Sequence, residues 1–190
     1  ARKGGKDKLK SVDEFTEDFK AFEGLFNLYQ DTVKGDMYMH VPATVLDHEF
    51  IYFSQVEDGV VSSGFFRGSY RGSKVVTFHR HFGQLEVHAE NTNFRVDPDN
   101  ALSKAAQANL NTPILASVKI EAEDSTGYVV SADALFLRED LQMIKPPSRP
   151  GRKSALGKLS KAKSKVVDIA NYPMNTELSV DYVYDNGSPS

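Results

Sequence analysis

No cysteine occurs among the 190 residues, so the chain can form neither a disulfide framework nor a thiolate metal site. This absence is compatible with either side of a membrane and does not assign a compartment. No apolar run approaches the roughly 20 residues that a membrane-spanning helix needs. We therefore expect no transmembrane segment.

Charge of one sign is not in large excess either. The formal net charge is -3, which argues against a protein that binds nucleic acid with its whole surface. The first ten residues, ARKGGKDKLK, are basic and lack the apolar stretch of a signal peptide. We expect residues 1–10 to form a mobile basic arm at a mature or trimmed terminus.

The motifs of common hydrolases are also missing. No serine stands in a GxSxG or SxxK pattern, and a cysteine nucleophile is excluded. His48-Glu49 begins like the zinc-binding motif HExxH, but no second histidine stands four residues after His48. The carboxylates are spread along the chain without a clear acid–base pair. The sequence therefore predicts that this chain is not an enzyme and has no catalytic or cofactor-binding residue.

What the sequence does contain is alternation of apolar and polar residues. The stretch 24–42, GLFNLYQDTVKGDMYMHVP, places on one face Phe26, Leu28, Met37, Met39 and Val41. Side chains alternate across a strand with period 2, so two half-buried strands are indicated. Between them, residues 31–36 have turn composition, and Gly35 can take positive φ. We predict an early β-hairpin whose edge later strands can join.

Before this hairpin, apolar residues recur at helical spacing: Val12, Phe15, Phe19 and Phe22. Ser11 and Glu14 have the spacing of a capping box. Gly24 stands where the end of a helix favours positive φ. A short amphipathic helix is expected between Ser11 and Gly24.

Several further elements are expected downstream. Strands are predicted at 50–56 (FIYFSQV, a buried strand), 114–122, 128–130 and 178–184. The glycine-rich stretch 58–73 is expected to be a long mobile loop, and 98–111 has the composition of a helix. Ser131 or Asp133 is expected to cap another short helix.

Residues 74–90 predict a second hairpin around a Gly83-Gln84 turn. Its core face would hold Phe78, Phe82, Leu85 and Val87. On the opposite face, His79 would pair with His88, and His81 with Glu86.

Three imidazoles and one carboxylate, from His79, His81, His88 and Glu86, form an acceptable ligand set for zinc. The alternative is a solvated polar face, because ligands carried on a sheet need a convergence that spacing does not establish. We favour this alternative and expect at most weak metal binding. No cofactor is therefore expected in this chain.

The segment 145–165 differs from the rest, since it carries eight basic residues, three prolines and no acidic residue. No aromatic residue stands there to stack on nucleic-acid bases. We expect a flexible, solvated loop and no nucleic-acid partner.

Six fragments occur in a fixed order: GLFNLYQDTVKGDMYMHVP, FIYFSQV, KVVTFHRHFGQLEVHAENTNFRV, ILASVKI, YVVSADALFL and NYPMNTELSVDYVY. Together they resemble the region of unknown function that precedes the catalytic domain in large bacterial zinc-dependent, metzincin-like metalloproteases. The similarity spans roughly Ser11 to Tyr184. It implies a periplasmic, outer-envelope or extracellular protein whose C-terminal protease domain carries zinc and HExxH. This chain has neither, so no catalytic or metal-binding residue is transferred to it.

The patterns together predict an α+β fold. It would consist mostly of antiparallel β-hairpins, forming a sheet or a partly open barrel with short helices packed on it. Residues 11–184 would form one domain with a flexible basic loop at 145–165. Residues 185–190 would be the end of a linker.

Three functional hypotheses follow. In the first, the chain is the non-catalytic N-terminal domain of a zinc metalloprotease and serves as scaffold, prodomain-like regulator or substrate guide. Its partners would be the C-terminal protease domain and possible peptide substrates. In the second, it is a stand-alone β-rich binding module for an envelope glycan or peptide. The third, least favoured, is an enzyme in its own right.

Overall fold

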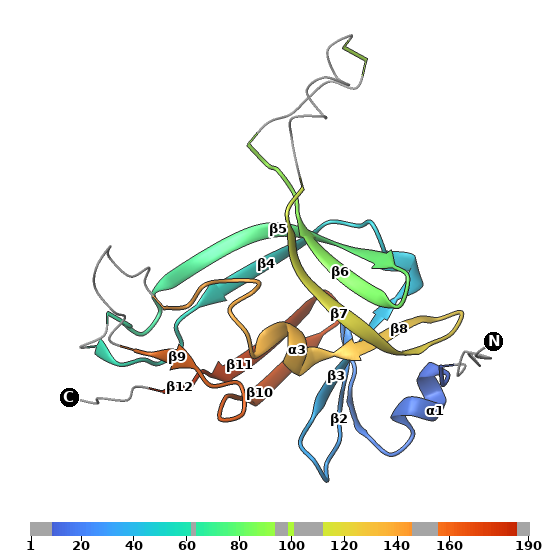
Figure 1. Cartoon of the computed structure of the whole chain (residues 1–190), viewed down its shortest axis with the longest axis horizontal. Coiled ribbons are helices and arrows are strands. Elements are labelled where there is room, and N and C mark those ends of the chain that lie inside the picture. The colour runs from blue at the N-terminus through green and yellow to red at the C-terminus, as the bar shows by residue number, and fades with distance from the viewer. Residues whose placement is uncertain (1–8, 62–63, 94–98, 101–111, 146–155, 186–190) are drawn as a thin grey trace, which may run out of the picture.

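The computed structural model describes residues 9–61, 64–93, 99–100, 112–145 and 156–185. Its main element is an antiparallel sheet of eight strands that curls into half of a barrel (Figure 1). The strand order is β1-β2-β3-β8-β7-β6-β5-β4, so β1 and β4 are the edges. The elements are α1 (Val12–Thr16), β1 (Lys20–Phe22), β2 (Asn27–Gln30), β3 (Met37–Pro42), η1 (Ala43–Val45), β4 (Phe50–Gln55), β5 (Tyr70–His81), β6 (Gln84–Ala89), β7 (Ile114–Glu123), β8 (Gly127–Ser131), α3 (Ala132–Phe136), β9 (Lys158–Leu159), β10 (Lys165–Tyr172), β11 (Asn175–Asp181) and β12 (Tyr184–Asp185).

Two small antiparallel sheets complete the described fold, the β10–β11 hairpin and the short β9–β12 pair. The β10–β11 hairpin lies on the inner side of the curled sheet (Figure 1), where Val166, Ile169 and Leu178 pack against the core. We call the opposite side of the sheet its outer face. The predicted α+β fold of antiparallel hairpins with short helices is confirmed.

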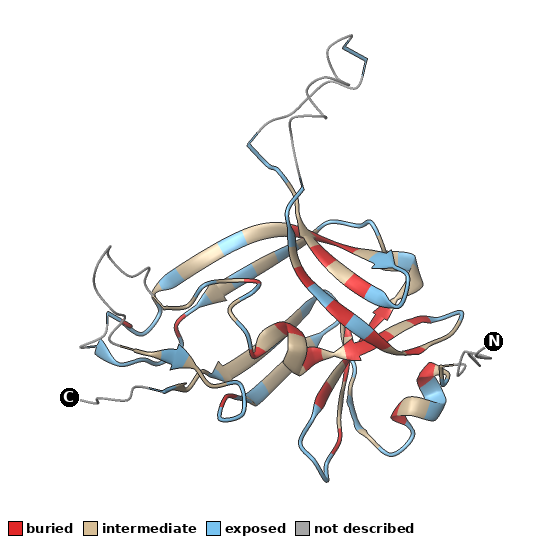
Figure 2. Ribbon diagram, viewed as in Figure 1, coloured by how far each residue is buried: buried red, intermediate tan, exposed pale blue. Residues whose placement is uncertain are grey.

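The β2–β3 hairpin forms as predicted and lies at the centre of the core. The apolar residues of its inner face are all buried: Phe26, Leu28, Met37, Met39 and Val41. Figure 2 shows how the buried positions follow the strands of the large sheet. In the turn, Gly35 takes a φ of 85° and Gly35 N donates to Asp31 O at 2.7 Å. Both strands therefore owe their register to burial of the apolar side chains on one face.

The helix predicted between Ser11 and Gly24 is shorter than expected. The capping box is present, because Ser11 Oγ accepts from Glu14 N (3.3 Å) and Glu14 Oε2 accepts from Ser11 N (3.1 Å). The helix nevertheless ends at Thr16, and Lys20–Phe22 pairs with β2 as an edge strand. Short helices gain little by themselves, so pairing with a preformed hairpin prevails over the helical spacing.

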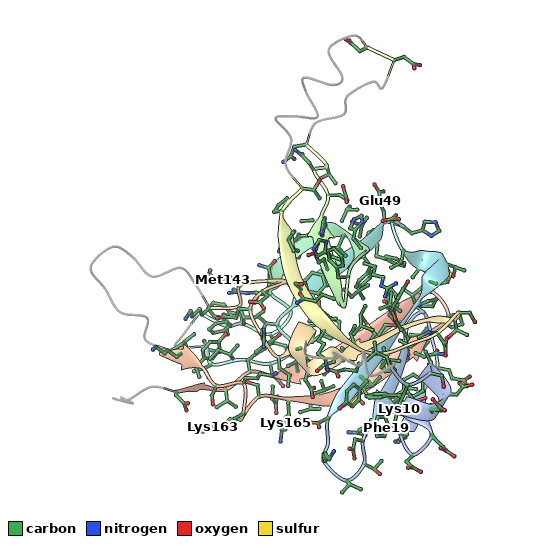
Figure 3. All side chains as sticks on the ribbon, turned by 45° about the vertical axis from the view of Figure 1, so that its right-hand side comes forward. Lys10, Phe19, Glu49, Met143, Lys163 and Lys165 are labelled. Carbon is green, nitrogen blue, oxygen red and sulfur yellow. The ribbon has the colours of Figure 1, made fainter. Side chains whose placement is uncertain are left out.

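The rings of Phe15, on α1, and Phe19, just before β1, pack on the outer side of the first hairpin. The Phe15 ring meets Tyr38 edge-on, with centroids 5.0 Å apart, and Phe19 stacks on Tyr38 at 5.4 Å. Phe19 lies at the same end of the molecule as Lys10 (Figure 3). The apolar stripe that suggested a long helix is thus divided between α1, the residues that follow it and β1.

Asn171, on β10, ties the C-terminal hairpin to the start of the first one. Its Nδ2 donates to Phe22 O and to Phe26 O, both at 2.8 Å, and its Oδ1 accepts from Thr176 Oγ1 at 2.7 Å. Gly24 does not have the predicted positive φ. Glycine is needed there for close approach, because a Cβ would overlap the Asn171 amide.

β4, predicted as a buried strand, is an exposed edge. Phe50 and Tyr52 face the core, whereas the alternate side chains Ile51 and Phe53 point outward and are 80% and 54% exposed. The prediction failed because a run of β-forming residues does not reveal whether both faces are covered.

The prediction of a mobile arm at 1–10 is wrong for its last two residues, Leu9 and Lys10. Residues 1–8 lie outside the described part of the chain. Leu9 packs against the core, and Lys10 forms an isolated parallel bridge with Ala122. Lys10 O also accepts from Glu123 N at 3.1 Å. Backbone pairing with β7 therefore begins before α1.

The basic segment predicted as a flexible loop is ordered in its second part; residues 146–155 lie outside the described residues. Lys158–Leu159 pairs with Tyr184–Asp185, and Lys163 Nζ forms an ion pair with Asp185 at 2.6 Å. Ser164 is buried, and its Oγ accepts from Val183 N at 3.1 Å. Asp185, expected in a linker, therefore belongs to β12.

The glycine-rich stretch has an anchored side chain. Phe65 is buried, as is Val56 at the end of β4, and Gly64 and Gly68 take positive φ beside them. The helix expected at 98–111 falls almost wholly outside the described residues. Ser131 caps α3 as predicted, accepting from Ala134 N at 3.1 Å.

Candidate functional site

The histidines predicted on the second hairpin do lie on the outer face of β5 and β6, but in a different register. The two-residue turn is Phe82-Gly83, so His79 lies opposite Glu86 and Thr77 opposite His88. Phe82 takes a φ of 51° and is 84% exposed instead of entering the core. The predicted Gly83-Gln84 turn, and with it the pairing of His79 with His88, is therefore wrong.

Three of the four predicted residues still come together. The rings of His79 and His88 are diagonal neighbours with centroids 4.3 Å apart. His88 Nε2 lies 2.9 Å from Glu86 Oε2. His81 does not join them: it is exposed, and its ring contacts Phe82 edge-on at 4.8 Å.

The structure adds three residues that the sequence analysis missed. Asp47 Oδ1 lies 2.6 Å from His79 Nδ1, His79 Nε2 lies 2.8 Å from Thr77 Oγ1, and Thr77 Oγ1 donates to Glu90 Oε1 at 2.7 Å. We call the six residues together the histidine–carboxylate face: Asp47, Thr77, His79, Glu86, His88 and Glu90.

Asp47 reaches this face because β4 pairs with β5. The antiparallel register places Phe50 opposite Val76, and continuing it backward brings Asp47 opposite His79. Asp47 has a φ of 61°, a conformation that aspartate tolerates better than most residues. Predicting the β4–β5 pairing would have revealed this contact.

The order of contacts, carboxylate to imidazole to hydroxyl, is that of a nucleophilic triad, but the hydroxyl is not presented to a substrate. Thr77 is 4% exposed, and its hydrogen is donated to Glu90. The Thr77 hydroxyl and both ring nitrogens of His79 thus have partners within the protein.

The same contacts bear on the zinc ligand set considered for His79, His81, His88 and Glu86. Both ring nitrogens of His79 already face protein partners, so an ion would have to displace one of them. Across the described ranges, no group of three or more histidine or carboxylate side chains is arranged to hold a metal ion. The expectation of at most weak metal binding stays a prediction.

A shallow depression adjoins the face where β6 ends. Its volume is about 250 Å³, and it is lined by Ala89, Glu90, Asn91, Thr92, Asn93 and Pro113. Glu90 thus borders both the depression and the contact with Thr77. The lining is polar and suited to hydrogen bonding more than to apolar ligands.

A second polar cluster stabilises the opposite end of the sheet. Asp124 accepts from Thr126 Oγ1 (2.6 Å), Thr126 N (2.7 Å) and Val12 N (2.8 Å), and the Thr126 hydroxyl and amide lower the pKa of Asp124 to about 2. Burial lowers the pKa of the neighbouring His40, against the opposing effect of Asp124. This cluster fixes the start of α1 to the β7–β8 turn.

Two family models, both for domains of unknown function, match this chain. A family model described as Domain of unknown function (DUF5117) matches residues 68–190, well over half of the chain. The chain belongs to the DUF5117 family. A second model, Domain of unknown function (DUF5118), matches residues 9–59. No curated protein and no solved structure matches the chain.

In this DUF5117 protein the two matched regions contribute to one sheet. The DUF5118 match contains β1 to β4, and the DUF5117 match contains β5 to β8; they meet where β4 pairs with β5 and β3 with β8. Asp47 and His79 come from different matches, so the histidine–carboxylate face needs both. None of the helices in the described part of the chain is long and apolar enough to span a membrane.

Proposed function

We propose that this chain is the non-catalytic N-terminal domain of a secreted or envelope bacterial zinc metalloprotease. It serves the protease as scaffold, prodomain-like regulator or substrate guide. The protease domain, C-terminal in the same polypeptide, supplies the zinc and the catalytic residues.

The observation that carries the proposal is how the resembling fragments fall on the fold. The first fragment, GLFNLYQDTVKGDMYMHVP, forms the β2–β3 hairpin, and FIYFSQV lies at β4. The fragment that begins KVVTFHRHF contains the β5–β6 turn. ILASVKI lies in β7, and YVVSADALFL forms β8 and α3. The last one spans the turn from β10 into β11 and β12. The resemblance therefore follows whole structural elements through the sheet and is not confined to one motif.

The histidine–carboxylate face supports a non-catalytic role. Thr77, the one hydroxyl in contact with a histidine there, is buried and bonded to Glu90. His79 is held on two sides by Asp47 and Thr77. Such a network fixes the positions of β4, β5 and β6 relative to one another, as a scaffold requires.

Two experiments test the proposal. The coding sequence beyond Ser190 should encode a domain with HExxH, whereas a stop codon directly after it would favour a stand-alone module. The purified chain should not cleave casein with or without added zinc, measured against a metalloprotease as positive control. Chelator-sensitive cleavage that disappears in His79→Ala would contradict the non-catalytic assignment.

One observation favours the second candidate, a stand-alone binding module for an envelope glycan or peptide. The outer side of β4 exposes Ile51 and Phe53, and Tyr70 beside them is 61% exposed. Exposed apolar and aromatic groups on a sheet are typical of binding surfaces.

A further inference from the structure

β4 is an open edge of the large sheet. It is the last strand in the sheet order, and β5 is its one partner strand within the described residues. Its six residues, FIYFSQ, include no charged residue and no proline. A strand of this kind leaves a row of main-chain N–H and C=O groups available for pairing.

The opposite edge is protected in the ways that natural sheets use. β1 has three residues and begins with Lys20. Asn171 Nδ2 donates to the carbonyl oxygen of Phe22, and Leu25 N donates to Tyr172 O of β10 at 2.7 Å. Short length, charge and covering contacts all discourage the addition of another strand. β4 is neither short nor charged, and this distinguishes it from the β1 edge.

The outward side chains of β4 form an apolar strip. Ile51 and Phe53 lie on the same side of the strand, and the Phe53 ring contacts the ring of Tyr70 with centroids 5.7 Å apart. These side chains are 80%, 54% and 61% exposed, in the order Ile51, Phe53 and Tyr70. A neighbouring strand would cover the strip with alternate side chains.

Acidic residues stand at both ends of β4. Asp47 and Glu49 precede it and Glu57 and Asp58 follow it, and all four are exposed. Glu49 is labelled in Figure 3. Of these four residues, Asp47 is paired with His79. The apolar strip between the two acidic ends carries no charge. The charge pattern is therefore complementary to a segment with an apolar middle and basic ends.

We propose that β4 binds an extended peptide as a ninth strand of the sheet. The peptide has alternating apolar side chains that rest on Ile51 and Phe53, and basic residues near both ends. Main-chain hydrogen bonds to β4 supply affinity, and the strip and the acidic ends supply selectivity. The inference rests on β4 and the residues beside it, and it holds for a protease-associated domain and for a stand-alone module.

The test uses the complete 190-residue chain, labelled with ¹⁵N, and the synthetic peptide acetyl-KVTVTVTK-amide. Titration followed by NMR should show saturable binding, with amide shifts confined to β4 and its flanking residues. The same peptide with all its main-chain amides N-methylated keeps its side chains but has no main-chain N–H to donate along either edge. It should bind at least about tenfold more weakly.

Protein variants locate the site. Ile51→Lys and Phe53→Lys change exposed side chains and add charge that repels the basic peptide ends, so each should weaken binding about tenfold or more. Val33→Lys is the matched control, because Val33 is 92% exposed on the β2–β3 turn, away from β4. It should bind the peptide as the unmodified chain does. Thermal unfolding of all three confirms that they fold.

Three results would overturn the proposal. Equal binding of the N-methylated peptide would show that main-chain pairing is not involved. Binding weaker than about 1 mM, or unaffected by both lysine variants, would exclude β4 as the site. Dimers of the chain alone, detected by sedimentation velocity and lost in Ile51→Lys, would identify a second copy as the occupant of the edge.

Discussion

The β2–β3 and β5–β6 hairpins have the same alternation of side chains but different connections. In β2–β3, residues 31–36 form the turn, and a glycine, Gly35, takes the positive φ. In β5–β6 the turn has two residues, and the residue with positive φ is Phe82, which is also exposed. The second turn therefore adds strain, and burial of Phe78, Leu85 and Val87 must hold that hairpin in register.

The largest expected effect tests the burial that both hairpins share. Phe26 packs between Phe50 and Phe78, with ring centroids 5.0 and 5.5 Å away. Phe26→Ala should therefore lower the free energy of unfolding by about 3 kcal/mol or more, measured by urea denaturation. Phe82→Ala, at an exposed position, is the control and should change it by less than about 0.5 kcal/mol. Equal effects of the two would place the core elsewhere.

A second prediction concerns the external tie that β2–β3 has through Asn171. Asn171→Ala leaves the carbonyls of Phe22 and Phe26 without this donor, which should cost about 2 kcal/mol of unfolding free energy. Gly24→Ala should destabilise through the same contact, because its Cβ would displace the Asn171 amide. In the double variant the two costs should not add, since the smaller alanine side chain at position 171 removes the overlap. Additive costs would show that Gly24 acts through something other than Asn171.

The two turns themselves give a pair of opposite predictions. Phe82→Gly should raise the free energy of unfolding by about 1 kcal/mol, because glycine takes positive φ without steric cost. Gly35→Ala, in the other hairpin, should lower it by about the same amount. Both are measured by urea denaturation. A loss of stability in Phe82→Gly would mean that the exposed ring makes a contribution beyond the turn.

A smaller effect should appear in the dependence of stability on pH. Burial lowers the pKa of His40, on β3, below its ordinary value of 6.5, so the unfolded chain binds more protons than the folded chain just below that pH. The contribution of neutral His40 is complete above about pH 6.5 and is lost as the pH falls toward the folded-state pKa. His40→Asn should lose less stability than the unmodified chain between about pH 6.5 and 5. His81→Asn, at an exposed position on β5, should keep the original slope.

The smallest expected signal is metal binding by the β5–β6 hairpin. Chain purified without a histidine tag should contain no stoichiometric zinc, because both ring nitrogens of His79 already have protein partners. Elemental analysis measures this directly. One zinc per chain that disappears in His79→Ala would contradict the prediction and make the histidine–carboxylate face a metal site.

The sequence predicted which face of a strand each side chain takes better than it predicted which residue lies opposite it on the neighbouring strand. Moving the pairing of His79 from His88 to Glu86 shifts it by two positions along β6, which leaves the paired side chains of both strands on the same faces. Alternation alone therefore cannot separate the two registers, and the turn residues favoured the wrong one. The contact of Asp47 with His79 depends on strand pairing between distant segments, which alternation does not encode.

The tie made by Asn171 also has a consequence in time. Asn171 lies 149 positions after Phe22 and 145 positions after Phe26, whose carbonyl oxygens it binds. These hydrogen bonds therefore cannot form during synthesis until most of the chain has left the ribosome. Contacts this distant in sequence form slowly, because a long loop must close first. Until then the β1 edge has neither Asn171 nor the β10–β11 hairpin beside it and is open to pairing with other nascent chains. The edge that is best protected in the finished protein is thus open for most of the time that the chain takes to be made.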